Sequence, residues 1–186
     1  MGIAHRVRWI LLAWFGVAGV AGATGYEVNG VQLGMTQAEV QAVFGDKIQC
    51  SARAPSDTDP SQVTCVSTAF AQKKVLSDTF VGLKTVIWYH VLDGHVAWIS
   101  FLGLPSMAFD DVVKRMEKTY GKADVASKDI NIGIKSSDMV NKRATWHNEA
   151  GDAIVFDKYT AGNLDRSYLN FYSKSWPQSL RPAAVD

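Results

Sequence analysis

The chain has 186 residues, of which 47% are hydrophobic in type, and its 19 Lys and Arg nearly balance its 18 Asp and Glu. Nucleic acids and anionic membrane surfaces select a basic footprint, so this balance argues against either as the main partner. The length suits one domain with one core and is too short for two comfortable domains.

The first 23 residues have the order of a secretory signal peptide. Arg6 and Arg8 precede an uncharged apolar run over residues 9–20, and small residues follow at 21–23. The run is about a dozen residues, shorter than the roughly 20 that a membrane-spanning helix needs. We therefore predict cleavage after Ala23 and a periplasmic or secreted product without stable membrane insertion, with an uncleaved N-terminal anchor as the alternative. A lipid anchor has no attachment point, because no cysteine lies near this site.

Two cysteines, Cys50 and Cys65, lie in the part predicted to be exported. They flank a turn-rich stretch over residues 54–61, with strand-like sequence on either side. In an oxidising compartment such a pair predicts a disulfide, and closing a loop of about 15 residues is worth roughly 3 kcal/mol in the chain-entropy model. We interpret the pair as structural, because redox-active cysteines are usually two residues apart at a helix start.

A short helix is predicted over residues 36–44. Thr36 and Glu39 have the spacing of a capping box, and Gly45 supplies the stop. The helix is expected to bury Val40, Val43 and Phe44 on one face.

A second helix is predicted between Ser106, as its N-cap, and Gly121, as its end. Asp110 and Asp111 fall in the first turn, where the helix dipole favours acidic groups. They are not interpreted as a catalytic pair, because adjacent residues of a helix point about 100° apart. Helical spacing predicts one apolar stripe, made of Phe109, Val112, Val113, Met116 and Tyr120.

Strand patterns occupy the rest of the chain, over residues 49–53, 63–67, 84–91, 95–101, 143–147, 153–159 and 167–172. Asp93-Gly94 is the strongest hairpin signal among them. A regular two-residue turn there pairs His90 with Ala97 and Trp88 with Ile99, and it places Tyr89 and Trp98 together on the other face. The predicted fold class is α+β, with two helices packed on an antiparallel sheet.

The sequence also has the outline of a tandem repeat within a single domain over residues 24–174, with units at about 31–101 and 102–174. Phe44-Gly45 corresponds to Tyr120-Gly121, and Trp88 corresponds to Trp146, each with a turn after it. The stretch between the cysteines is interpreted as an insertion in the first unit. Residues 175–186, which lack periodicity, are predicted to be a flexible tail.

The stretch VQLGMTQAEVQAVFG over residues 31–45 resembles the opening helix of the SmpA/OmlA family of bacterial envelope proteins, with its Gly-Met-Thr cap and its Phe-Gly end. Two helix-plus-sheet units in tandem are similar to the architecture of beta-lactamase inhibitory protein. The resemblance implies an exported bacterial protein whose helices pack on an antiparallel sheet and whose open sheet face or loops bind another protein. SmpA/OmlA members of the outer-membrane assembly machinery are lipoproteins, whereas this chain lacks the lipid-accepting cysteine.

Sequence motifs for catalysis are missing from the chain, and we predict no catalytic residue, no metal site and no cofactor. His90 and His95 fall on one predicted face, but local spacing supplies no further ligand for zinc. His147, next to a turn, is interpreted as a solvated side chain.

Six tryptophans, of which Trp9 and Trp14 lie in the predicted signal peptide, exceed what a small core needs. Aromatic side chains are the usual anchors of interfaces, and we predict a binding face drawn from Tyr89, Trp98 and Trp146. The predicted function is that of a non-enzymatic module that binds another envelope or secreted protein. Two alternatives stay open: an inhibitor of a secreted hydrolase, and a hydrolase whose carboxylates converge only in the fold.

Overall fold

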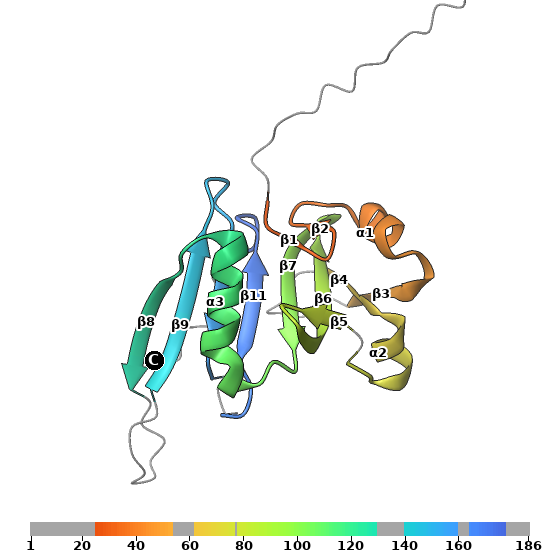
Figure 1. Ribbon diagram of the computed structural model, residues 1–186. Coiled ribbons are helices and arrows are strands. Elements are labelled where there is room, and N and C mark those ends of the chain that lie inside the picture. Colours follow the sequence, from red (N-terminus) through yellow and green to blue (C-terminus); the bar gives the residue numbers. More distant parts are fainter. Residues whose placement is uncertain (1–24, 54–61, 77, 130–139, 160–163, 178–186) are drawn as a thin grey trace, which may run out of the picture.

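The computed structural model describes residues 25–53, 62–76, 78–129, 140–159 and 164–177. The predicted signal peptide lies outside these residues, as do positions 178–186 of the predicted tail. The described part is a mixed α+β fold in which short helices pack on one large antiparallel sheet, and this confirms the predicted fold class (Figure 1). Among the described residues, no helix has the length and apolar character that crossing a membrane requires.

The main sheet has nine strands, all paired antiparallel. They are β3 (Ile48–Arg53), β4 (Gln62–Ser67), β5 (Asp78–Phe80), β6 (Leu83–Leu92), β7 (His95–Leu102), β8 (Asp124–Asp129), β9 (Val140–His147), β10 (Ala153–Asp157) and β11 (Tyr168–Tyr172). Their spatial order is β3-β4-β6-β7-β11-β10-β9-β8, with β5 paired to part of β6. Two up-and-down meanders therefore meet in the middle of the sheet, where the last strand of each, β7 and β11, pair with each other.

Each meander follows a helix, α1 (Gln37–Phe44) in the first half and α3 (Phe109–Tyr120) in the second. This arrangement supports the prediction of two helix-plus-sheet units, but the predicted correspondence between Trp88 and Trp146 is wrong. Trp88 lies on β6, the third strand of its meander, whereas Trp146 lies on β9, the second. The extra segment of the first unit is α2 (Thr68–Lys73) with β5, because the β3-β4 hairpin has a counterpart in β8-β9.

The capping box of α1 is present as predicted. The Glu39 backbone N–H donates to Oγ1 of Thr36 at 3.3 Å, and the Thr36 N–H donates to Oε2 of Glu39 at 2.7 Å. The Thr36 hydroxyl donates to the same Oε2 at 2.8 Å. The Thr36 N–H and this hydroxyl together lower the pKa of Glu39, because both bonds favour the ionised carboxylate. Val40 is buried, but Val43 is 44% exposed and the prediction for it is wrong. Val43 faces the turn at Gly30 between β1 (Glu27–Val28) and β2 (Val31–Gln32), which covers it only in part.

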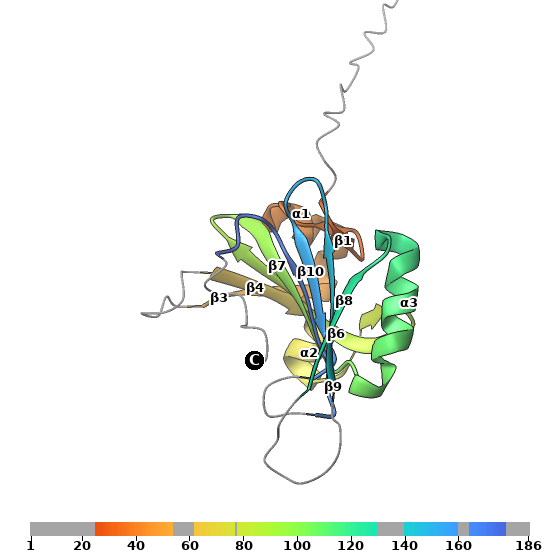
Figure 2. The same cartoon turned by 90° about the vertical axis from the view of Figure 1, so that its left-hand side faces the viewer.

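Helix α3 begins later than predicted, because the chain enters it through the 3-10 turn η2 (Ser106–Ala108). Ser106 does not cap the helix, since its hydroxyl donates to the backbone oxygen of Leu164 at 2.7 Å. The predicted apolar stripe is confirmed, with four of its members buried and Tyr120 packed against the core. Seen along the sheet, α3 lies on one side only (Figure 2).

The strand register defines a core face. Tyr89, Ile99, Phe171, Ile154 and Trp146 are successive partners across five neighbouring strands, so their side chains form one row on the same side. Helix α1 covers one end of this face through the contact between the Phe44 and Tyr89 rings, and α3 covers the other end through Phe109 and Phe156.

Helix α2 is not predicted from the sequence. Its N-cap is Ser67, whose Oγ accepts from the Phe70 N–H.

The predicted disulfide is confirmed. Cys50 and Cys65 are directly opposite each other on β3 and β4, and their sulfur atoms are 2.02 Å apart. Cys65 points into the core, where it is fully buried, so the bond ties the edge strand β3 to the interior.

Candidate functional site

The hairpin of β6 and β7 departs from the predicted register at one point. Leu92 pairs with His95 as predicted, but a β-bulge between His90 and Val91 makes Ala97 an extra residue. His90 therefore pairs with Trp98 rather than with Ala97. Because side chains alternate between the faces of a sheet, this one-residue shift moves every later side chain of β7 to the opposite face.

The predicted binding face of Tyr89, Trp98 and Trp146 is accordingly wrong as a single surface. Tyr89 and Trp146 do share a face, but it is the core face, and each is only 3% exposed. Trp146 is held there by a hydrogen bond from its indole Nε1 to the backbone oxygen of Gly121 at 2.8 Å. Trp98 lies on the opposite side of the sheet and is half-buried.

An aromatic cluster surrounds Trp98 on this opposite side, which faces away from α1 and α3. The Trp98 ring stacks on His90 at a centroid distance of 3.9 Å and an interplanar angle of 14°. It also contacts the rings of Tyr172 at 6.1 Å and Trp176 at 5.1 Å. Trp88, two residues before His90 on β6, lies beside it at a centroid distance of 6.1 Å. We call this set, Trp88, His90, Trp98, Tyr172 and Trp176, the aromatic face.

Polar groups fix the rings of the aromatic face in place. The Trp98 indole Nε1 donates to Oδ1 of Asn170, a fully buried residue on β11, at 2.8 Å. His90 is 4% exposed, and its two ring nitrogens lie within hydrogen-bond distance of hydroxyls, 2.9 Å from Ser100 Oγ and 3.3 Å from Thr64 Oγ1. Both ring nitrogens of His90 therefore already have partners on neighbouring strands of the sheet. His95 stands apart from it, exposed at the hairpin turn, where its Nδ1 lies 3.0 Å from the Asp93 oxygen.

Two indoles of the aromatic face are incompletely satisfied. The Nε1 atoms of Trp88 and Trp176 are buried and have no hydrogen-bond acceptor among the residues that the structure describes. Buried donors of this kind are rare in folded proteins and each costs about 1–3 kcal/mol. The indoles of Trp98 on the same face and of Trp146 on the core face, by contrast, each donate to an oxygen at 2.8 Å.

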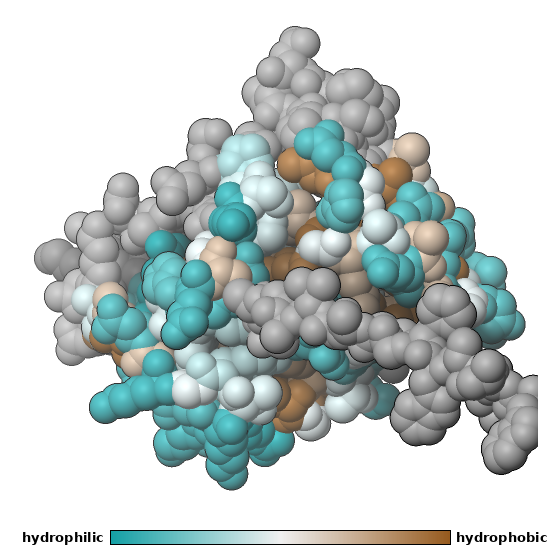
Figure 3. Space-filling view, turned by 90° about the horizontal axis from the view of Figure 1, so that it is seen from above, coloured by the Kyte–Doolittle hydropathy of each residue, from teal (hydrophilic) through white to brown (hydrophobic). Residues whose placement is uncertain are grey.

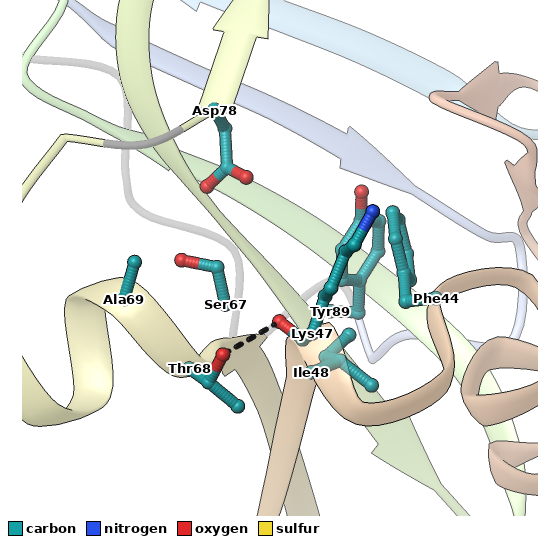
Figure 4. Close-up of a pocket in the computed structure, with 8 residues that line it drawn as sticks. All are labelled: Phe44, Lys47, Ile48, Ser67, Thr68, Ala69, Asp78 and Tyr89. Carbon is teal, nitrogen blue, oxygen red and sulfur yellow. Dashed lines mark hydrogen bonds between the residues drawn. The ribbon is translucent and has the colours of Figure 1, made fainter.

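A second candidate site lies at a gap in the sheet. The β4 strand pairs with β6 over Trp88–Leu92, and β5 pairs with the same edge of β6 over Leu83–Thr85. Between these stretches the Ile87 N–H has no strand partner, and the carboxylate of Asp78 accepts it through Oδ2 at 3.0 Å. A cavity of about 340 Å³ opens at this gap, with Asp78 and Tyr89 among its lining residues (Figure 4).

Burial dominates the electrostatics of this cavity. It raises the pKa of Asp78 above the ordinary aspartate value, and the Ile87 N–H and the charge of Lys84 oppose the shift only in part. Burial also raises the pKa of the Tyr89 phenol, with a smaller contribution from the negative charge of Asp78. The fold therefore disfavours the ionised form of the Asp78 carboxylate.

Replacing Asp78 with asparagine is expected to stabilise the protein at neutral pH. An amide oxygen still accepts the Ile87 N–H, while the desolvation cost of the charge disappears. Because the folded-state pKa is raised, the penalty is absent below the ordinary aspartate pKa and appears as the pH rises through the raised value. We expect the variant to melt at a higher temperature than the wild type at pH 7, and at the same temperature near about pH 3, where both side chains are neutral.

Thermal unfolding followed by circular dichroism at the two pH values tests this. Asp46→Asn, which removes an exposed carboxylate from the neighbouring turn η1 (Gly45–Lys47), is the matched control and should change neither midpoint. If the variant at position 78 melts below the wild type at pH 7, the ionised carboxylate stabilises the fold and does not carry a net desolvation cost.

Sequence reasoning missed Trp88, Trp176 and Asp78 as site residues. Trp176 falls in the predicted tail, yet it is buried against Trp98, so the prediction of flexibility is wrong at that residue. The available signal was a tryptophan, the largest side chain in a tail otherwise made mostly of small and polar residues. Asp78 carries no such signal, because its role follows from the gap between two strands that are distant in sequence.

The described residues hold no group of three or more histidine, cysteine, aspartate or glutamate side chains arranged for a metal ion. Comparisons of the chain with protein-family models, with curated proteins and with solved structures found no match.

Proposed function

We propose that the chain is an exported, non-enzymatic protein that binds another envelope or secreted protein through the aromatic face. The observation that carries the proposal is the asymmetry of the sheet. Both long helices pack on the core face, while the opposite face presents half-buried Trp88 and Trp98 around a stacked histidine. Tryptophan is enriched at binding hot spots, where it supplies a large apolar area at a small cost in conformational entropy.

The end of the molecule that carries α1 offers a weaker anchor. The end that carries α1 and the hairpin turns shows hydrophobic residues only in small areas between hydrophilic ones (Figure 3). Export is supported by the disulfide, which suits an oxidising compartment, and by the N-terminal sequence pattern.

An inhibitor of a secreted hydrolase is the second candidate, and it specifies the partner within the same binding mode. The observation that favours it is the meeting of two four-stranded meanders at β7 and β11, which is the tandem outline that suggested such an inhibitor from the sequence. The aromatic face spans that junction, since Trp98 and Tyr172 are direct partners across it.

Replacing Trp98 with alanine is expected to reduce partner capture about thirtyfold, the effect of losing a hot spot worth about 2 kcal/mol. The mature protein is immobilised and exposed to the envelope and culture fractions of its source, and bound proteins are quantified by mass spectrometry. Met107→Ala is the control, because Met107 is 96% exposed on η2, outside the aromatic face.

A second variant guards against a folding defect, since removing the Trp98 indole leaves Asn170 without that donor. Leu92→Lys adds a charge beside the cluster at a half-buried position and should also abolish capture while the far-ultraviolet spectrum stays native. Equal capture by wild type and both variants, or capture of nothing by the wild type, would refute the aromatic face as the binding site.

A further inference from the structure

The gap between β4 and β5 places the carboxylate of Asp78 beside an apolar cavity. The chain leaves the sheet after Ser67, forms α2, and returns at Asp78, so the side chain of Asp78 fills the place that a continuous strand would occupy. Oδ2 is used by the Ile87 N–H, whereas Oδ1 accepts no hydrogen bond from any described residue. Nor does Asp78 form an ion pair with a described residue. One carboxylate oxygen is therefore left open toward the cavity (Figure 4).

Two other polar groups of the cavity, the hydroxyls of Ser67 and Thr68, already have hydrogen-bond partners. The Ser67 hydroxyl caps α2 through the Phe70 N–H, and the Thr68 hydroxyl donates to the backbone oxygen of Lys47 at 3.3 Å. Lys47 also lines the cavity (Figure 4), but unlike Asp78 it is an exposed residue, so its ammonium group keeps its contact with solvent. Asp78 is thus the group in the cavity best placed to orient a ligand through a hydrogen bond.

The walls facing this carboxylate are apolar and aromatic. The rings of Phe44 and Tyr89 are 5.6 Å apart at an interplanar angle of 40°, and Ile48 lines the same side. The volume of about 340 Å³ lies at the small end of ligand cavities, so it suits a compact molecule with one ring.

We propose that this cavity binds a small organic ammonium ion, whose N–H group donates to Oδ1 of Asp78 and whose apolar part packs against Phe44, Ile48 and Tyr89. A desolvated carboxylate is stabilised by a cation, and aromatic walls attract the same cation through their ring faces. A neutral ligand gains only the apolar contacts, and an anion is repelled by the negative charge of Asp78. The site differs from the aromatic face, because its aromatic walls lie on the core side of the sheet, although Phe70 of α2 contacts Trp88 at a centroid distance of 6.3 Å.

Phenethylamine and 2-phenylethanol are the probes, because they have the same ring and chain length and differ in the charged group. Binding to the ¹⁵N-labelled mature protein is followed by nuclear magnetic resonance titration at pH 7. We expect phenethylamine to bind at least about tenfold more tightly than the alcohol, as one charge-assisted hydrogen bond predicts. The shifted resonances should be those of α2, β5 and the turn after α1.

Asp78→Asn removes the charge and keeps an oxygen for the Ile87 N–H, so it isolates the proposed interaction from folding. This variant should lose about tenfold in affinity for phenethylamine and keep its affinity for 2-phenylethanol. Asp46→Asn, at an exposed position close by in the chain, should bind both probes as the wild type does. The proposal is overturned if phenethylamine causes no shifts at the cavity, if the alcohol binds equally well, or if Asp78→Asn binds the amine unchanged.

Discussion

Replacing Phe171 with alanine is expected to lower the free energy of unfolding by about 3–5 kcal/mol, the range for truncating a buried phenylalanine. Phe171 is fully buried on β11, and its ring contacts the rings of Tyr26, Phe80, Phe101 and Tyr120 at 5.6–6.1 Å. These four neighbours come from the N-terminal segment, β5, β7 and α3, so one side chain joins both halves of the protein. Their separate origins also limit how far the cavity can collapse after truncation.

Urea unfolding followed by circular dichroism measures this loss, with the wild-type slope as a check that the transition keeps its cooperativity. Met107→Ala is again the control, because an exposed substitution should stay within about 0.5 kcal/mol of the wild type. A loss below about 1 kcal/mol for Phe171→Ala would mean that the two halves are not joined through this ring.

Reducing the bond between Cys50 and Cys65 is expected to cost about 3 kcal/mol of stability. The separation of 15 residues sets the loop that the bond closes in the unfolded chain. The bond also fastens β3, an edge strand whose only strand partner among the described residues is β4. Amide protons of β3 should therefore lose hydrogen-exchange protection first.

The measurement compares oxidised and reduced wild-type protein in urea, so that no atom other than the two thiol hydrogens differs. Intact mass should rise by about 2 Da on reduction, which verifies the starting state. Identical midpoints for the two forms, or uniform loss of protection across all strands, would show that the bond does not hold the β3 edge.

Local signals in the sequence predicted much of the fold. The Thr36 capping box, the apolar stripe of the second helix and the Asp93-Gly94 turn each depend on residues a few positions apart, and each is present. The cysteine pair was predictable because few cysteines leave few pairings. Such features are decided by spacing along the chain, which a sequence displays directly.

The candidate site was less predictable, because it depends on contacts between distant strands. One bulged residue, Ala97, decides whether Trp98 joins Tyr89 in the core or His90 on the opposite side. Because β6 and β7 are apolar on both faces, the alternation of side chains along them does not indicate which face Trp98 takes. The role of Asp78 depends on β4 and β5 sharing one edge of β6, which no spacing along the chain encodes.

The pairing of β7 with β11 has a consequence for the order of folding. Every strand of the first meander is complete once residue 102 has been made, but the partner of its inner edge begins only at Tyr168. Until then β7 presents unpaired backbone groups, the kind of edge that recruits strands from other chains. The final closure joins segments about 70 residues apart, as in Trp98 and Asn170, and such long-range pairing is slow. The molecule is thus most vulnerable to aggregation just before its last strand arrives, and completing the sheet also completes the aromatic face.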